Sequence, residues 1–194
     1  MPSLQGTETA KNLMHSFVAE TSVAARYDYY AKEAKKEGYV QIQNIFEETA
    51  RNEREHAKRF LKHLKEDYNG EKIGFCEEFP VMLSNTKDNL MEAIQGEAHE
   101  FLDLYPKYAE VAKKEGFPEI QKRFIEISEV EKQHKIRFQK LLKNIENGMV
   151  FNKKEEVRWK CNNCGYVHTA TQALKVCPAC DHEQEHFEML CENY

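Results

Sequence analysis

The stretch RNEREHAKRF at residues 51–60 has a counterpart, EVEKQHKIRF, at residues 129–138. Each copy places a glutamate three residues before a histidine, and the two copies lie 78 positions apart. Residues three apart share one face of an α-helix, so each pair directs a carboxylate and an imidazole at the same point in space. Apolar residues recur around both copies at three- and four-residue steps, which is typical of an amphipathic helix. The sequence therefore predicts two helices that each carry Glu-x-x-His on or beside the buried face.

The similarity between the two halves extends well beyond these motifs. Residues 31–65 align without gaps to residues 109–143, and Gly38 and Gly116 interrupt the two copies at equivalent places. Glycine between two periodic segments favours a helical hairpin, and two such hairpins joined by a long connection indicate a bundle. Helical character covers roughly 4–37, 40–67, 86–115 and 118–147. We expect a mainly α fold, a ferritin-like four-helix bundle with one long crossover at about 68–85.

The residues after Gly148 differ in character from the rest of the chain. They include the charged stretch NKKEEVR, contain five of the six cysteines, four of them in two close pairs, and have little helical periodicity. We therefore expect two domains, a helical one at 1–148 and a small metal-binding one at 149–194. A domain this short is expected to need its metal to fold.

Composition and charge exclude several classes of function. Charged residues make up 31% of the 194 residues, and the formal net charge is −5 with both signs mixed. This balance does not indicate a nucleic-acid-binding surface. No apolar run is long enough to span a membrane, and the first residues lack the pattern of a secretory signal. We expect a cytoplasmic protein without nucleic-acid or membrane partners.

The paired motifs predict a metal centre inside the bundle. Two Glu-x-x-His helices together supply Glu53, His56, Glu131 and His134, and the other two helices add Glu20 and Glu97. One glutamate from each of two helices plus Glu-x-x-His from the other two is the inward-facing set of a di-metal carboxylate bundle. Mixed oxygen and imidazole ligands suit iron or manganese. The alternative is that these side chains are solvated charges, but two coincidences at equivalent repeat positions favour the metal site.

One irregularity interrupts the repeat. The offset of 78 carries Tyr27 onto Tyr105, but it carries Glu20 onto Ala98 rather than Glu97. We therefore predict a one-residue bulge in the third helix between Glu97 and Tyr105, a device often found at functional sites. The same helix carries a fifth carboxylate one turn after Glu97, at Glu100, whereas His99 between them lies on a different face and is expected to be solvated.

The C-terminal cysteines predict a second metal site. Cys161 and Cys164 form one C-x2-C pair, and Cys177 and Cys180 form another after twelve intervening residues. This spacing is typical of one tetrahedral ion held by four thiolates, and both zinc and iron accept it. The phrases Cys-Gly-Tyr and Cys-Pro-x-Cys favour the knuckles of a rubredoxin-like iron site. We expect a small core around this site, formed by Trp159, Tyr166 and Phe187. The remaining cysteines, Cys76 and Cys191, are expected to be free thiols without an assigned role.

With both motif sets in view, the chain resembles the rubrerythrin family along essentially all of its length. The resemblance implies a ferritin-like diiron bundle followed by a rubredoxin-like domain. It also implies that the diiron site reduces hydrogen peroxide to water in oxidative-stress defence, with electrons arriving through the four-cysteine iron. Family members are typically cytoplasmic homodimers, so a homodimer is expected here.

The resemblance also implies a role for each candidate residue. Glu53 and Glu131 would bridge two non-haem irons. One iron would add Glu20, with Glu100 when oxidised and His56 when reduced; the other would add Glu97 and His134. Tyr27 and Tyr105 would hydrogen-bond ligand glutamates. A third iron would bind Cys161, Cys164, Cys177 and Cys180, with zinc or manganese as possible substitutes.

Two rival functions share parts of this pattern. A ferritin-like ferroxidase or iron-storage protein would have the same bundle and site, but storage needs a large hollow assembly and gives no use for a redox tail. A structural bundle with a zinc-ribbon interaction module would bind zinc alone at the cysteines. The sequence does not identify the electron donor, which would be rubredoxin or an NAD(P)H-dependent reductase.

The position of the tail predicts how electrons travel. Glu131 lies 17 residues before Gly148, so a helix rising about 1.5 Å per residue would place its exit ~25 Å from the metals. The four-cysteine site of one chain is then badly placed for its own diiron site. A head-to-tail homodimer would bring it beside the diiron site of a second chain, and we expect electron transfer between subunits.

Overall fold

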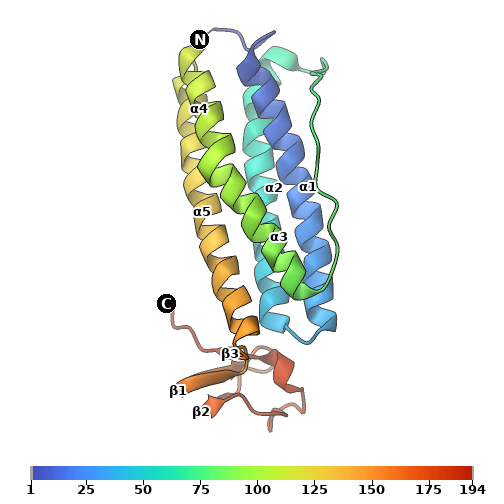
Figure 1. The fold of residues 1–194 in the computed structure, drawn as a ribbon, viewed down its shortest axis with the longest axis vertical. Helices are drawn as coiled ribbons and strands as arrows, with labels where there is room; N and C mark the ends of the chain where they lie inside the picture. The colour runs from blue at the N-terminus through green and yellow to red at the C-terminus, as the bar shows by residue number, and fades with distance from the viewer. Residues whose placement is uncertain (1, 194) are drawn as a thin grey trace.

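The computed structural model describes residues 2–193, which form a long helical bundle with a small sheet beyond one end (Figure 1). Its helical elements are α1 (Glu8–Lys36), α2 (Val40–Tyr68), α3 (Thr86–His99), the π-helix η1 (Glu100–Leu104), α4 (Tyr105–Lys114) and α5 (Pro118–Glu146). Because α3, η1 and α4 follow one another without a break, they form the third long helix of the bundle. The predicted four-helix bundle is confirmed.

The predicted crossover is also present. Residues 71–85 have no regular secondary structure, and this segment runs along the bundle beside α1 before α3 begins (Figure 1). Asn85 ends the crossover, and its side chain accepts a hydrogen bond from the backbone N–H of Asp88 in the first turn of α3. Thr7 caps α1 in the same way through Ala10. Such caps satisfy backbone donors that a helix leaves unpaired at its start.

The turns within the two hairpins are equivalent. Gly38 follows α1 with φ of +78°, and Gly116 follows α4 with φ of +85°. This left-handed backbone is available to glycine without steric cost, which explains why glycine ends the helix at the same place in both halves. Pro118 then occupies the first turn of α5, where its missing N–H costs nothing.

Two aromatic triads fill the bundle core, and they are related by the internal repeat. Tyr27, Phe46 and Phe138 have ring centroids 5.1–5.6 Å apart. The other triad consists of Tyr105, Phe124 and Phe60, which occupy the equivalent positions in the repeat, 78 residues away from Tyr27, Phe46 and Phe138. Its ring centroids are 5.2–5.8 Å apart. All six side chains are at most 2% exposed. Since each triad takes one phenylalanine from the opposite hairpin, the triads join the two hairpins into one core.

The C-terminal segment forms a three-stranded antiparallel sheet in the order β2-β1-β3. Its elements are β1 (Asn152–Cys161), β2 (Val167–Gln172), the short 3-10 helix η2 (Gln184–His186) and β3 (Phe187–Met189). Trp159 and Phe187 are buried, with Tyr166 packed against them, as predicted. The indole N–H of Trp159 donates to the Ala170 carbonyl at 3.0 Å.

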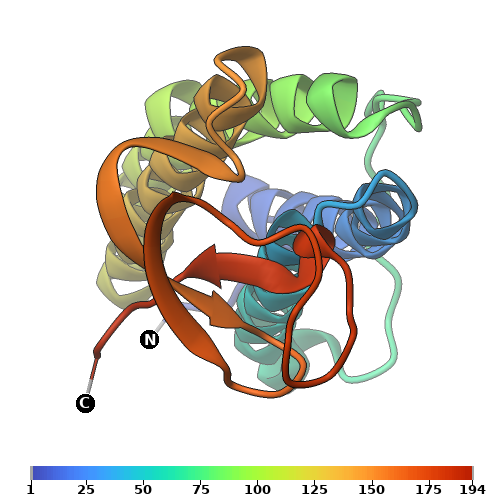
Figure 2. The same cartoon turned by 90° about the horizontal axis from the view of Figure 1, so that it is seen from below.

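The sheet lies across the end of the bundle where the α1–α2 turn is found (Figure 2). Tyr39, the residue before α2, stacks on Phe151 with ring centroids 6.5 Å apart. A Cβ atom at Gly38 would lie 3.4 Å from the Glu185 carboxylate, so the turn and the tail are in close contact. Among residues 2–193, no helix combines the length and the apolar character needed to cross a bilayer.

Candidate metal centres

Four helices bring six predicted ligands to the middle of the bundle. Glu20 comes from α1, Glu53 and His56 from α2, Glu97 from α3, and Glu131 and His134 from α5. The side chains form two overlapping groups, in each of which the ligand atoms lie within 4.8 Å of one another: Glu20, Glu53, His56 and Glu131 in one, and Glu53, Glu97, Glu131 and His134 in the other. Only the two central glutamates belong to both groups, so the site has two halves with a shared middle.

The distances in the two halves are nearly the same. The Nδ1 atom of His56 lies 2.8 Å from Glu53 Oε2 and 3.0 Å from Glu131 Oε1. The Nδ1 atom of His134 lies 3.0 Å from Glu53 Oε1 and 2.9 Å from Glu131 Oε2. Each shared carboxylate therefore directs one oxygen toward each histidine, the arrangement needed to bridge two cations.

These close atoms do not satisfy one another as hydrogen-bond partners. Both carboxylate oxygens of Glu53 and Glu131 and the Nδ1 atoms of both histidines are buried without a hydrogen bond of acceptable geometry. Buried polar groups normally have partners, because leaving a charge unpaired in the interior is costly. Atoms that approach within 3 Å and yet point at a common space are arranged as ligands of a cation. The donor set, four carboxylates and two imidazoles, fits a pair of divalent metal ions.

The pKa values in the site follow from burial and mutual contact. Burial, reinforced by the nearby Glu131 carboxylate, raises the pKa of Glu20 to about 8. Burial also opposes ionisation of Glu53, but contacts with His134 and His56 outweigh it and lower the pKa of Glu53 to about 2. Burial favours neutral His134, yet its contacts with Glu131 and Glu53 raise its pKa to about 12. Protons thus compete with cations for these oxygen and nitrogen atoms, and metal binding should release the protons.

Two buried tyrosines hold the outer glutamates. The hydroxyl of Tyr27 donates to Glu97 Oε1 at 2.6 Å, and the hydroxyl of Tyr105 donates to Glu20 Oε1. Each tyrosine reaches from one hairpin to the glutamate of the other. Since each of these bonds occupies one oxygen, the second oxygen of each glutamate remains free to face the histidine of its own group.

The predicted bulge in the third helix is confirmed. Residues 100–104 form the π-helix η1, in which the Tyr105 backbone N–H donates to the Glu100 carbonyl five residues earlier. A π-turn holds one residue more than an α-turn. Glu97 can therefore lie eight residues before Tyr105 on the same helix and still occupy the place equivalent to that of Glu20, which lies seven residues before Tyr27. His99 is exposed, as predicted, with Asp103 3.7 Å away.

Glu100 lies apart from the other candidates. Its side chain is only 8% exposed, but it belongs to neither group of mutually close ligand atoms. It lines a cavity between α1 and the third helix instead. The structure therefore groups His56, and not Glu100, with Glu20. Glu100 lies next to the site without joining either group.

The four tail cysteines converge on one point. Cys161, Cys164, Cys177 and Cys180 have sulfur atoms that all lie within 4.8 Å of one another. The Cys161–Cys180 and Cys164–Cys177 sulfur distances are 3.8 and 3.6 Å. These are far beyond a disulfide bond, but they match the edge of about 3.8 Å of a tetrahedron with metal–sulfur bonds of about 2.3 Å. The cysteines fit a single tetrahedral ion, while Cys76 and Cys191 are exposed free thiols, as predicted.

Some of the surrounding residues were not found from the sequence. His15 on α1 lies against the crossover, with its Nδ1 atom 3.0 Å from the Tyr108 hydroxyl and its Nε2 atom 3.6 Å from Glu77. Arg137, one turn after His134, binds Glu48 at 2.7 Å and the Thr49 hydroxyl at 2.6 Å. A lone histidine or arginine on a helix face carries no motif, so only the three-dimensional packing identifies these neighbours.

Comparisons with known proteins agree with both sites. The family model described as rubrerythrin matches residues 11–142, and the model of the rubrerythrin rubredoxin-like domain matches residues 159–188. A rubrerythrin of Clostridium perfringens is 51% identical over the whole of both chains. A rubrerythrin of Nitratidesulfovibrio vulgaris is 42% identical, again over the whole of both chains.

Solved structures show the same architecture. Fully reduced nigerythrin, 25% identical, covers 97% of this chain and is itself covered to 92%, with a TM-score of 0.64. A bacterioferritin of Desulfovibrio desulfuricans, 19% identical, covers 73% of this chain and is covered to 82%, with a TM-score of 0.66, which supports the ferritin-like bundle as a fold. The two domains identified by the family models imply iron binding in the bundle and at the four cysteines. The full-length relatives and the two matching models show that the chain belongs to the rubrerythrin family of oxidoreductases.

Proposed function

We propose that this chain is a non-haem diiron peroxidase that reduces hydrogen peroxide to water in oxidative-stress defence. The observation that supports this most strongly is the presence, in one chain, of a buried paired carboxylate–imidazole site and a four-thiolate site. The first suits two-electron chemistry on a small molecule, and the second suits one-electron transfer from a donor. None of the six cysteines forms a disulfide, which favours a reducing compartment such as the cytoplasm.

The proposed metal complement is three irons per chain, with zinc or manganese as possible substitutes. Glu53 and Glu131, which belong to both groups, would bridge two irons. Glu20 and His56 would complete one ligand set, and Glu97 and His134 the other. Glu100 would replace His56 in the oxidised protein, as the family resemblance implies. When bound, the iron pair supplies the two electrons that cleave the O–O bond of hydrogen peroxide.

The chain's own residues set the conditions for this reaction. Burial of the two groups excludes bulk water, which strengthens their electrostatic interactions. Tyr27 and Tyr105 fix one oxygen of each outer glutamate, so that only the other oxygen can turn toward the centre. Glu100, when it is not a ligand, would give a proton to the departing oxygen.

Electrons would reach the bundle from the tail of a second chain. The tail of the same chain lies beyond the end of the bundle (Figure 1), whereas His134 reaches a surface cavity of about 380 Å³ between α2 and α5. Lys140 lines this cavity beside the Arg137–Glu48 ion pair and would attract an acidic partner surface. A head-to-tail homodimer would place one chain's four-cysteine iron near the other chain's His134. The tail would be reduced by rubredoxin or by an NAD(P)H-dependent reductase.

The experiment that tests the function is anaerobic turnover with a reductase that reduces the tail. Iron-loaded protein should oxidise one NADH for each hydrogen peroxide added, and the rate should depend on peroxide concentration. Protein loaded with zinc only should be inactive and serves as the control. Consumption of NADH that requires oxygen and ignores peroxide would contradict the proposal.

Transfer between subunits has its own test. A mixed dimer pairs a Cys161→Ser chain with a Glu53→Ala/His56→Ala chain, neither of which should be active by itself. In the hybrid one chain supplies an intact four-cysteine iron and the other an intact diiron site, so transfer between subunits restores part of the activity. An inactive hybrid of verified composition would show that each tail serves its own chain.

A further inference from the structure

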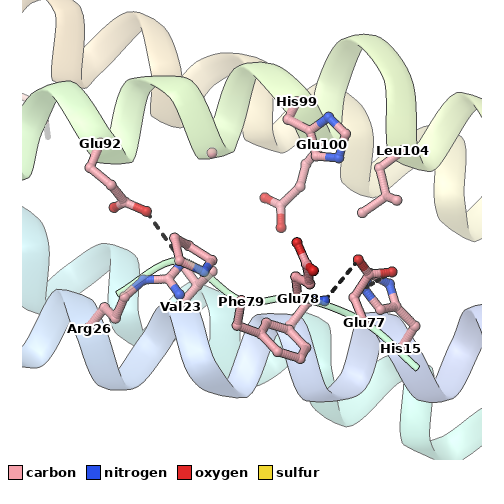
Figure 3. A pocket seen from close by; sticks show the side chains of 13 residues that line it. His15, Val23, Arg26, Glu77, Glu78, Phe79, Glu92, His99, Glu100 and Leu104 are labelled. Atoms are coloured by element: carbon pink, nitrogen blue, oxygen red, sulfur yellow. Dashed lines mark hydrogen bonds and ion pairs between the residues drawn. The ribbon is translucent and has the colours of Figure 1, made fainter. Parts of the chain in front are cut away.

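A cavity of about 180 Å³ lies between α1, the third helix and the crossover. Its walls are formed by residues 19 and 23 of α1, by residues 96 and 100 of the third helix, and by crossover residues 77–80. Figure 3 shows these walls, with the crossover passing below the space between the two helices. The cavity thus lies beneath a surface segment and extends to the buried residue Glu100.

A buried carboxylate projects into this cavity. Glu100 extends from the third helix into the space between the helices, toward the side on which Glu78 and Phe79 of the crossover lie (Figure 3). The residue is 8% exposed, and its carboxylate oxygens are not among the fully buried unpartnered atoms, although no hydrogen bond or ion pair to them is found among residues 2–193. A carboxylate without a protein partner is solvated by water or another polar molecule. The cavity is therefore a space that small polar molecules occupy.

Two small residues keep the cavity open next to the metal ligands. Gly96 directly precedes Glu97, and Ala19 directly precedes Glu20, so they are equivalent in the two hairpins, and both line the cavity. A Cβ atom added at Gly96 would meet nothing within 4 Å. Glycine inside a helix costs roughly 1 kcal/mol relative to alanine. Because Gly96 has helical backbone and no close neighbour, neither conformation nor packing explains the glycine, and its missing side chain leaves space open beside Glu97.

His15 of α1 attaches the crossover wall beside the cavity. His15 stacks on Phe79 with ring centroids 6.1 Å apart and meets the edge of Phe75 at 5.7 Å. Its Nε2 atom lies 3.6 Å from Glu77, and its Nδ1 atom is bonded to the Tyr108 hydroxyl. These contacts hold the crossover over the outer end of the cavity, so the route has a defined mouth rather than an open groove.

We propose that this cavity is the passage by which hydrogen peroxide reaches Glu100 and the metal centre, and that the side chain at position 96 sets its width. This inference rests on the peroxidase function proposed above. A volume of about 180 Å³ is several times the roughly 30 Å³ that one water occupies in the liquid, so hydrogen peroxide fits readily. Larger side chains at position 96 should slow large hydroperoxides before they slow hydrogen peroxide.

The test fills the passage after the protein has folded and bound iron. Gly96→Cys is made in a Cys76→Ser/Cys191→Ser background, in which the four tail cysteines are held by their metal, and is then alkylated with iodoacetamide. Gln95→Cys in the same background is the matched control, because residue 95 is exposed on a different face of α3. Two rates are measured: optical binding of azide to the oxidised diiron site, and single-turnover oxidation of the reduced protein by hydrogen peroxide or cumene hydroperoxide.

Alkylation at position 96 should slow azide binding and peroxide oxidation by roughly tenfold, equivalent to about 1.4 kcal/mol of barrier, and should slow cumene hydroperoxide further. Alkylation at position 95 should leave the rates within about twofold. If the Gly96→Cys protein does not react with iodoacetamide while the Gln95→Cys protein does, the cavity is closed to solvent and the proposal is wrong. Unchanged rates after alkylation of the Gly96→Cys protein would also overturn it.

The two proposals fail in different ways. If alkylation of the Gly96→Cys protein slows azide binding, but the protein never reacts with peroxide, the passage is supported and the peroxidase function is refuted. Normal peroxide oxidation in the fully alkylated Gly96→Cys protein would retain the function and refute the passage. Gly96→Ala completes the series, since it should raise the thermal stability of the bundle and favour hydrogen peroxide over cumene hydroperoxide more strongly than the unsubstituted protein does.

Discussion

The two helical hairpins of the bundle have nearly the same sequence pattern, but only the second contains a π-helix. The first hairpin runs from Glu20 to Tyr27 in seven residues of regular helix, and the second runs from Glu97 to Tyr105 in eight. Despite the extra residue, both tyrosines donate to the glutamate of the opposite hairpin. The difference shows that the ligand positions are kept equivalent while the helix between them is altered.

The side chains opposite the two helices reflect this difference. The widened turn at η1 leaves the Phe101 carbonyl to accept from the Ser128 hydroxyl of α5 at 3.1 Å. The equivalent position in the other half, 78 residues earlier, is Ala50, which faces a regular helix and has no hydroxyl. Both hairpins also contribute to the cavity. Val23, three residues after Glu20, corresponds there to Glu100, three residues after Glu97. The second hairpin therefore adds polar function to a symmetric ligand frame.

The largest expected effect comes from the residues that both halves share. Glu53→Ala or Glu131→Ala should abolish iron binding in the bundle, because each glutamate belongs to both ligand groups. The absorption bands of the four-cysteine iron should remain, since the two sites bind metal separately. Metal analysis together with the optical spectrum measures both sites, and loss of both signals would show that the bundle and the tail fold as one unit.

A second variant tests the asymmetric carboxylate. Glu100→Gln should keep both bundle irons in the reduced protein, where His56 rather than Glu100 would be the ligand, but should lower peroxide turnover by roughly tenfold to a hundredfold, as expected for loss of one proton-transferring group. Val23→Leu, on the opposite wall of the same cavity, is the control for altered volume. Full turnover by Glu100→Gln would show that neither ligand movement nor proton delivery by this residue is needed.

A stability measurement tests how the π-helix is supported. Ser128→Ala should lower the free energy of unfolding by about 1–2 kcal/mol, because it leaves the Phe101 carbonyl without its partner. Ser16→Ala is the matched control: Ser16 is also buried, but its hydroxyl donates to the carbonyl of Asn12 within a regular helix, where the backbone already supplies a donor. Equal losses in the two variants, measured by denaturant unfolding, would contradict a special role for Ser128.

The smallest expected effect concerns the helix starts. Glu115 accepts from the backbone N–H groups of Glu8 and Thr9 and from the Thr9 hydroxyl, and its counterpart Glu37 accepts only from Thr86. Burial opposes ionisation of Glu115, but the bonds from Thr9 and Glu8 together outweigh burial and lower its pKa.

The sign of the pH dependence follows from this lowered pKa. Ionised Glu115 stabilises the fold, fully so above its unfolded pKa of about 4.3, and the contribution disappears as the pH falls through the lower folded value. Glu115→Gln should cost about 0.5–1 kcal/mol at pH 7 and nearly nothing in strong acid, as measured by unfolding of both proteins at each pH. Glu37→Gln should cost less at pH 7. A Glu115→Gln deficit that grows on acidification would contradict this assignment.

The sequence contained most of the ligand frame because helical spacing determines it. Glu53 with His56, and Glu131 with His134, must share a helix face, and the shifted number of Glu97 was sufficient to predict the π-helix. The two C-x2-C pairs likewise predicted the sulfur cluster without any knowledge of the sheet around it.

The cavity and its surroundings could not be predicted in the same way. The path of residues 71–85 has no period, so the contacts of His15 with Glu77 and Phe79 depend on tertiary packing alone. The spacing of Glu100, one turn after Glu97, predicted that it lies near the metal ligands. It did not predict that the Glu100 side chain extends into the cavity. The contact between Tyr39 and Phe151 also depends on how two separate domains meet.

The central claim is that peroxide is reduced in the bundle with electrons that arrive through the four-cysteine iron. The most direct test is stopped-flow mixing of fully reduced protein with hydrogen peroxide in excess over the three electrons that each iron-loaded chain would hold, followed by addition of a reductase and NADH. In the unsubstituted protein the thiolate-to-iron bands should appear as the tail is oxidised and should disappear when NADH is supplied, over repeated additions of peroxide. Cys161→Ser should be oxidised once by peroxide and should then resist reduction. Repeated turnover by Cys161→Ser at the unsubstituted rate would contradict the account.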